Sequence, residues 1–210
     1  VFPTVVPTTS PTVAPTRAPT VSPSAGRRLF EETTLYHVTA GGLSLIDISQ
    51  VLSIGTSSFE SCSSLTTINL PLATSLADSA FKSCTSLTTI NAPLVKSVGV
   101  GAFEGCTSLA TVNMPLVTSL GENSFKGCTS LSYVSLQSLN TVGNSAFEAC
   151  SNLVTVDFPV IGTVGVNAFR SCSSLYNFNG GGQLSLPSTL SSIGNNAFYQ
   201  CTGFRGDLYI

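Results

Sequence analysis

The sequence predicts a β-rich solenoid, a stack of short coils made of parallel strands and turns, preceded by a disordered stalk rich in Pro and Thr. Two observations predict the solenoid. A Phe-x-x-Cys pair occurs seven times, and its first six copies follow a constant 22-residue period. Apolar residues also recur at fixed offsets from each Cys, and a period in the twenties is typical of architectures in which each period forms one coil. A third observation, a Pro at every fourth position near the start of the chain, predicts the stalk.

The stalk is the first element in chain order and spans residues 1–28. Its six prolines, the first at Pro3 and the last at Pro23, fix φ and remove backbone donors. We therefore expect an extended, polyproline-like segment without helix or sheet. Thr follows five of these prolines, a composition found both in O-glycosylated stalks of secreted proteins and in plain disordered linkers. Both alternatives remain open.

The second element is the solenoid, residues 29–210. Its first coil is 40–61, with Ala40 in place of Cys, and its last coil is truncated at 201–210. From each Cys, apolar residues three, six and eight positions further give the pattern L-x-x-I-x-L. Its period-2 alternation predicts a short strand with one buried face. A Pro ends this strand in most coils. A second apolar position then precedes a turn that usually contains Gly, and the coil closes on its Phe.

One coil, which runs from Cys172 to Cys201, is longer than the others and has a 29-residue period. Three glycines, Gly180 to Gly182, separate two alternating runs within it, which predicts a turn and an added strand. The same elaboration begins again at Phe204, so we expect the natural protein to continue. The chain also begins on Val1 without a signal-peptide pattern, as expected for a mature or trimmed fragment.

The repeated pattern C-x-S-L-x-x-I-x-L-P-L-x-x-x-L-x-x-x-A-F-x-x-C resembles the BspA-like (Treponema-type) leucine-rich repeat over about residues 40–210. The stretch from Leu186 to Gly194, L-P-S-T-L-S-S-I-G, is similar to the family's L-P-x-x-L-x-x-I-G core, whereas the 22-residue coils lack one residue after Pro. The resemblance implies a leucine-rich-repeat solenoid. It also implies an extracellular or cell-surface location and a role in adhesion, because known members are mostly surface or secreted proteins of bacteria and protists.

Composition excludes several classes of function. Charged residues are 9% of the chain, with 8 Lys and Arg, 10 Asp and Glu and one His, against roughly 25% in an average domain. Nucleic-acid binding through a basic stripe is therefore excluded. Mean hydropathy is +0.37, yet Ser, Thr, Asn and Gly interrupt every apolar run, so no membrane span is predicted.

The sequence also gives no support for catalysis. The carboxylates are scattered rather than paired, and the sole His, His37, has no Ser or Cys partner at a recognisable spacing. The tripeptide Arg205-Gly206-Asp207 is interpreted as a turn into a strand rather than a receptor-binding motif. We therefore predict no catalytic residue, no metal site and no cofactor.

All seven cysteines occupy the same position of the repeat. Equivalent residues of successive coils stack about 5 Å apart, so these cysteines form one column. We interpret it as a structural ladder of buried thiols, because Cys is among the most buried residue types. Disulfides between neighbours are the first alternative and a metal site is the second. The column consists of Cys62, Cys84, Cys106, Cys128, Cys150, Cys172 and Cys201.

Two polar columns flank the apolar column of the predicted strand. The first consists of Thr67, Thr89, Thr111, Tyr133 and Thr155. The second consists of Asn69, Asn91, Asn113, Ser135 and Asp157. We expect both to project from the concave face as an uncharged, hydrogen-bonding surface, the kind of surface through which solenoids bind. An unselected solvated face is the alternative.

A further column, directly after Phe, alternates in sign from coil to coil. With neighbours about 5 Å apart, this alternation places each charge beside opposite ones, so we expect it to fix register and aid solubility. Its members are Glu60, Lys82, Glu104, Lys126, Glu148 and Arg170.

The sequence as a whole predicts a non-catalytic extracellular module for recognition or adhesion. Its partner would be a protein or glycan bound through a repeat surface, and not nucleic acid. One alternative is a structural or coating protein that binds ice, mineral or wall polysaccharide through the Thr and Asn columns. A third is the non-catalytic part of an enzyme or receptor whose other domains lie outside this sequence.

Overall fold

The computed structural model describes residues 34–35, 48, 50–179 and 186–204. Four features predicted from sequence lie wholly or partly outside these residues: the stalk, the start of the first coil, the strand added after the glycines of the long coil, and the Arg-Gly-Asp tripeptide. His37 lies outside them too.

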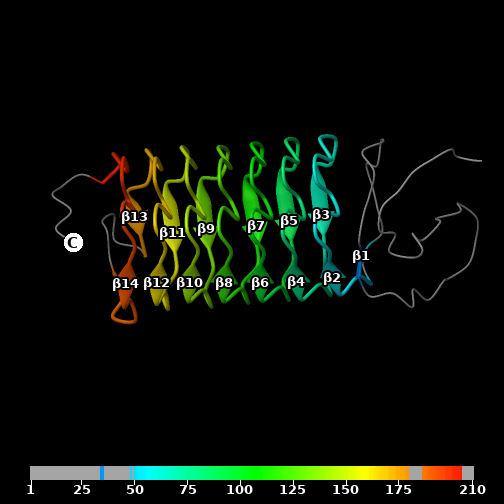
Figure 1. The fold of residues 1–210 in the computed structure, drawn as a ribbon, viewed down its shortest axis with the longest axis horizontal. Coiled ribbons are helices and arrows are strands. Elements are labelled where there is room, and N and C mark those ends of the chain that lie inside the picture. The colour runs from blue at the N-terminus through cyan, green and yellow to red at the C-terminus, as the bar shows by residue number, and fades with distance from the viewer. Residues whose placement is uncertain (1–33, 36–47, 49, 180–185, 205–210) are drawn as a thin grey trace, which may run out of the picture.

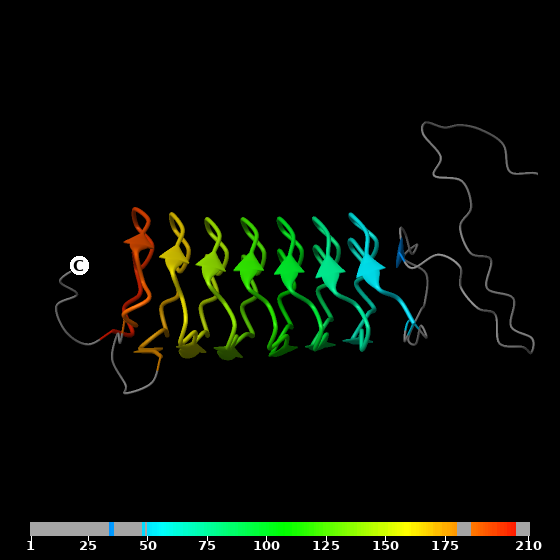
Figure 2. The same ribbon diagram turned by 90° about the horizontal axis from the view of Figure 1, so that it is seen from below.

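The described chain is a stack of coils, and each complete coil contributes strands to two sides of the stack (Figure 1, Figure 2). The strands of the first side are β3 (Thr67–Asn69), β5 (Thr89–Asn91), β7 (Thr111–Asn113), β9 (Tyr133–Ser135), β11 (Thr155–Asp157) and β13 (Asn177–Phe178). Those of the second side are β1 (Thr34–Leu35), β2 (Ser53–Ile54), β4 (Ser75–Leu76), β6 (Ser97–Val98), β8 (Ser119–Leu120), β10 (Thr141–Val142), β12 (Thr163–Val164) and β14 (Ser192–Ile193).

All strand pairing is parallel and follows the repeat. The second-side strands form one eight-stranded sheet, whereas the first-side strands form two three-stranded sheets, β3-β5-β7 and β9-β11-β13. Most partners are separated by one repeat period, as in Ser75↔Ser97. Across the long coil Thr163 pairs with Ser192, so the additional residues of this coil leave the register of the sheet unchanged. The predicted solenoid of parallel strands is thereby confirmed.

The second apolar position of each coil lies in a strand, although its sequence predicts only a turn there. The structure forms a strand there in every complete coil. Each of these strands has only two residues, the second of which is buried in most coils. Two residues are too few to show the period-2 alternation from which a strand is predicted.

The third side of each coil is a turn with the Phe at its centre. The residues two before and two after the Phe have positive φ, for example Ser79 (54°) and Ser83 (59°) around Phe81. In this conformation the N–H groups of Ser79, Phe81 and Ser83 all donate to carbonyls of the next coil, at 2.7–2.8 Å. The turn therefore connects neighbouring coils by backbone hydrogen bonds, as the strands do on the other two sides.

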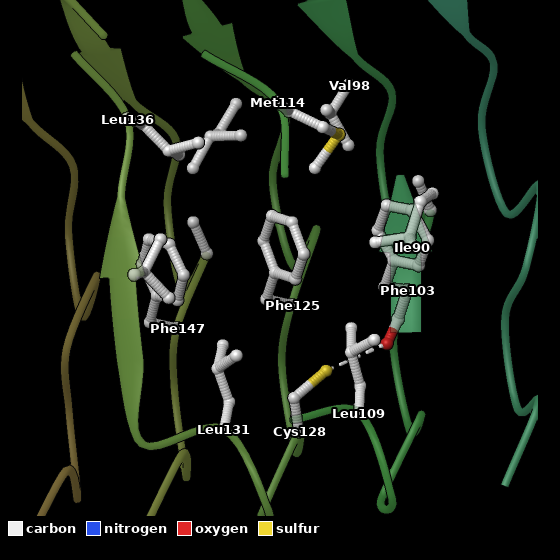
Figure 3. Close-up of a cluster of buried hydrophobic side chains, with 14 of the residues drawn as sticks. Ile90, Val98, Phe103, Leu109, Met114, Phe125, Cys128, Leu131, Leu136 and Phe147 are labelled. Atoms are coloured by element: carbon white, nitrogen blue, oxygen red, sulfur yellow. Dashed lines mark hydrogen bonds between the residues drawn. The ribbon is translucent and has the colours of Figure 1, made fainter. Parts of the chain in front are cut away.

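The core is the space enclosed by the three sides, and the Phe column fills its centre. Neighbouring rings from Phe59 to Phe198 have centroids 5.0–5.3 Å apart and are within 13° of parallel. Leu, Ile, Val and Cys columns surround this stack, as Figure 3 shows for the middle coils. Within the described part of the chain, no helical segment has the length and hydrophobicity needed to cross a membrane.

Candidate binding surface

The ten residues of the two predicted polar columns occupy the first and third positions of β3, β5, β7, β9 and β11. The middle position of each strand points into the core, since Ile68, Ile90, Val134 and Val156 are buried and Val112 is partly buried. Because side chains alternate along a strand, the ten polar residues share the outward side. They form a strip along the first side of the stack, which we call the polar strip.

Three asparagines in the polar strip form a ladder of side-chain hydrogen bonds. Asn91 Nδ2 donates to Asn69 Oδ1 at 2.7 Å, and Asn113 Nδ2 donates to Asn91 Oδ1 at 2.6 Å. Each of these bonds uses one N–H of an amide that has two, and one lone pair of an oxygen that has two. The ladder therefore fixes the orientation of the amides and leaves hydrogen-bonding capacity for a ligand.

The ladder ends where the sheet is interrupted, between β7 and β9. These strands are neighbours but belong to separate sheets. On the β9 side, Ser135 stands in the Asn column, and Gln137 stands where the four other coils have Pro. Gln137 Nε2 donates to Ser135 Oγ at 2.7 Å and to Asp157 Oδ2 at 2.6 Å, while Ser135 Oγ donates to the same carboxylate at 3.3 Å.

Tyr133 is the one aromatic residue among the ten. It stands in the Thr column of the same coil, and 54% of its surface is exposed. Its Cα partner in the next coil is Thr155, just as that of Ser135 is Asp157. The ring therefore lies on the same side of the sheet as the Ser135–Gln137–Asp157 cluster.

The alternating charge column lies at the turn, and four of its residues form two ion pairs between neighbouring coils. Lys82 Nζ is 3.0 Å from Glu104 Oε2, and Lys126 Nζ is 3.0 Å from Glu148 Oε2. The last cation of the column, Arg170, lies over the ring of Tyr199 at 5.6 Å from the centroid. Because these charges are used between neighbouring coils, they contribute to register rather than to a charged binding edge.

The cysteine column lies inside the core. All seven thiols are buried, and none of them forms a disulfide in the structure. Six of them donate an S–H hydrogen bond, 2.9–3.2 Å long, to the carbonyl of the Phe in the preceding Phe-x-x-Cys pair. Figure 3 marks the bond from Cys128 to Phe103. Burial raises the pKa of Cys150 and of Cys201 to about 12.

The chemistry of the polar strip is that of hydrogen bonding. Its side chains are hydroxyls, amides, one phenol and one carboxylate. Among the described residues, no group of three or more His, Cys, Asp and Glu side chains could hold a metal ion. The arrangement is therefore suited to recognising a ligand by its donors and acceptors.

Comparison with known proteins gives a family match over most of the chain. The model of the "BspA type Leucine rich repeat region" matches in six copies, over residues 26–116, 52–176 and 177–205. Among curated proteins, no sequence matches.

Solved structures of bacterial leucine-rich-repeat proteins share the fold. The Treponema pallidum leucine-rich-repeat protein is 28% identical with a TM-score of 0.67, and the match covers 82% of this chain and 78% of that one. A leucine-rich cell surface protein from Faecalibacterium prausnitzii is 26% identical with a TM-score of 0.63, covering 83% and 46%. A leucine-rich-repeat protein from Eubacterium ventriosum is 25% identical with a TM-score of 0.71, covering 85% and 48%. The chain thus spans about half the length of the last two.

Proposed function

Since the chain belongs to the BspA-type leucine-rich-repeat family, we propose that it is a non-catalytic recognition or adhesion module that binds a protein or glycan through its repeat surface. The observation that supports this function best is the polar strip. It presents hydroxyl and amide groups on five coils, in register within each of the two three-stranded sheets, on strands whose inward residues are buried or partly buried in the core. A surface that is already ordered loses little conformational entropy when it binds, so more of the interaction energy contributes to affinity.

Two findings support a place for this binding outside the cell or at its surface. One of the similar structures is a leucine-rich cell surface protein. The family resemblance read from the repeat pattern has the same implication. We expect the polar strip to determine which partner binds, because the charged side chains at the turn form ion pairs with each other between coils.

The coating alternative needs a longer regular array than this surface supplies. Ice, mineral and crystalline polysaccharide repeat their groups at fixed intervals, so a matching protein surface must repeat as well. Here the Asn ladder covers β3, β5 and β7 only, and Tyr133 and Ser135 interrupt both columns in the next coil. The interruption favours recognition of a discrete ligand.

Arrays of immobilised proteins and glycans probed with the whole chain test the proposal. We expect selective binding that is lost when Thr111→Arg and Tyr133→Arg are introduced together, because both residues are exposed on the polar strip. The matched control is Thr74→Arg with Thr118→Arg, two exposed threonines beside the second-side strands. No binding to either array, or equal loss in both double variants, would contradict the proposed function.

A further inference from the structure

We propose that the interruption of the polar strip at β9 and β11 is a binding site for a neutral oligosaccharide, with Tyr133 as the stacking platform and Gln137 and Asp157 as the hydrogen-bonding groups. This inference rests on the proposed function and deepens it, because it selects the glycan over the protein ligand and names the site.

The first argument is that this coil departs from the repeat only where side chains face outward. Tyr replaces Thr at 133, Ser replaces Asn at 135 and Gln replaces Pro at 137. The inward residues of the same segment, Val134 and Leu136, keep the repeat pattern and are 1% and 0% exposed. These substitutions therefore lie on the surface of the coil and leave its buried residues in place.

The second argument is that the substituted side chains are held together. The bonds of Gln137 Nε2 to Ser135 Oγ and to Asp157 Oδ2, at 2.7 and 2.6 Å, fix a planar amide beside a planar carboxylate. These two bonds use both N–H groups of Gln137, so Gln137 Oε1 and Asp157 Oδ1 are the atoms of the pair that face a ligand as acceptors. Two adjacent sugar hydroxyls can donate to these two oxygens at the same time.

The third argument is the exposed phenol ring. Tyr133 lies two residues before Ser135 on the same side of the strand, roughly 7 Å along the chain, which is about the width of one pyranose ring. A sugar that bonds to the cluster through its hydroxyls can thus place an apolar C–H face on the neighbouring ring. An aromatic side chain with a polar tip gives large contact area at low entropic cost.

Charge and apolar area favour a neutral glycan over the other ligands. The cluster contains one carboxylate and no cation, so it repels sulfated or sialylated sugars. A protein interface of stable affinity needs several fully desolvated apolar anchors, whereas this site presents a single ring among hydroxyls and amides.

The test is an array of neutral oligosaccharides of glucose, galactose, mannose and N-acetylglucosamine, followed by calorimetry with the best-bound one. We expect Tyr133→Ala to weaken binding about tenfold, as loss of one stacking contact would, and Tyr133→Phe to bind nearly as the wild type does. Asp157→Asn should weaken binding as well. Tyr199→Ala is the matched control, because Tyr199 is 53% exposed but lies at the turn, and it should leave affinity unchanged.

A second variant restores the repeat through Tyr133→Thr, Ser135→Asn and Gln137→Pro together. It should fold with wild-type stability or better, because it gives this coil the residues of its neighbours, and it should lose the glycan. Unchanged glycan affinity in this variant or in Tyr133→Ala would overturn the site. Binding of a protein but of no neutral glycan would overturn this inference and leave the proposed function standing, whereas binding of neither would remove both.

Discussion

At six positions a buried thiol takes part in holding one coil to the next. The Phe carbonyl that accepts the S–H bond also accepts a backbone N–H from the Cys of its own Phe-x-x-Cys pair. The Phe103 carbonyl, for example, accepts the N–H of Cys106 at 3.1 Å and the S–H of Cys128 at 3.2 Å. Cys is small, apolar enough for the core and still a weak donor. The spacing of the column was readable from sequence, but its acceptor was not, because the acceptor is a backbone group of the preceding coil.

The thiols should therefore be inert in the folded protein. Burial raises the pKa of Cys150 and Cys201 to about 12, so almost no thiolate forms near pH 8, and the thiolate is the reactive species. We expect iodoacetamide at pH 8 to label the native protein slowly and all seven cysteines after denaturation. Rapid native labelling of most cysteines, or three disulfides found by mass spectrometry, would contradict this expectation.

The ion pair between Lys126 and Glu148 should make stability depend on acid pH. Burial alone would raise the pKa of the Glu148 carboxyl, but hydrogen bonds from Lys126 and Ser145 and the nearby positive charges of Lys126 and Arg170 bring it below its ordinary value. A lowered carboxyl pKa contributes stability above the unfolded value of about 4.3, and this stability is lost as pH falls through the folded value.

The comparison of wild type with Lys126→Met by urea denaturation from pH 6 to pH 3 measures this contribution. The wild type should lose more stability than the variant over that interval, by less than about 1 kcal/mol because the pair is partly exposed. Repeating the series in 1 M salt should shrink the difference. Parallel pH profiles at low salt would show that the pair does not couple to folding.

Among the elements, the first-side strand was predictable and the rest of the coil was only partly so. The alternating apolar pattern from Leu65 to Leu70 and the Pro that follows it predict the strand and its end, and β3 (Thr67–Asn69) lies within that stretch. The Phe turn has no such signal, because its positive-φ positions carry Ser, Asn, Gly, Ala or Gln in different coils. Hydrogen bonds to the neighbouring coil, rather than residue type, impose the left-handed conformation there.

Gly105 lets the backbone cost of this turn be measured. Its φ is 72°, and a Cβ placed on it would meet nothing closer than Ser83 Oγ at 3.6 Å. Replacement by Ala should thus destabilise only through the left-handed backbone, by about 1 kcal/mol. Gly105→Asn should cost less, since Asn tolerates this conformation. The free energies of unfolding in urea test this ranking. If Gly105→Asn is less stable than Gly105→Ala, or if Gly105→Ala is as stable as the wild type, the left-handed turn imposes no such cost.

At the scale of the whole molecule, the repeat made the fold predictable and left the binding site open. Every coil offers the same columns, so the period alone fixed the order and register of the strands, as in Ser75↔Ser97. The outward residues are free of that constraint. The repeat pattern predicts that Tyr133, Ser135 and Asp157 lie in the two polar surface columns. It does not distinguish Tyr133 and Ser135 from the other members of those columns. Gln137 was missed, although its departure from Pro was a signal available in the sequence.

The columns should also differ in what they contribute to the stability of the stack. Phe103 is fully buried between Phe81 and Phe125, with ring centroids 5.3 and 5.1 Å away. Phe103→Ala should cost about 3–5 kcal/mol through the cavity that it leaves. Lys126→Glu places three acids in a row with Glu104 and Glu148, but it should cost only about 1 kcal/mol, and high salt should mask that loss.

Hydrogen exchange in the Phe103→Ala protein tests how far such damage spreads. Each coil of a solenoid contacts only its neighbours, so stability is close to a sum of coil and interface contributions. Protection should therefore fall mainly over residues 84–127, which contain the cavity and the neighbouring turn around Phe125, and persist in the coils that contain β11 and β12. A uniform loss of protection along the chain would mean that the stack unfolds as one unit. If Phe103→Ala instead costs no more than Lys126→Glu in urea, the Phe column does not hold the coils together.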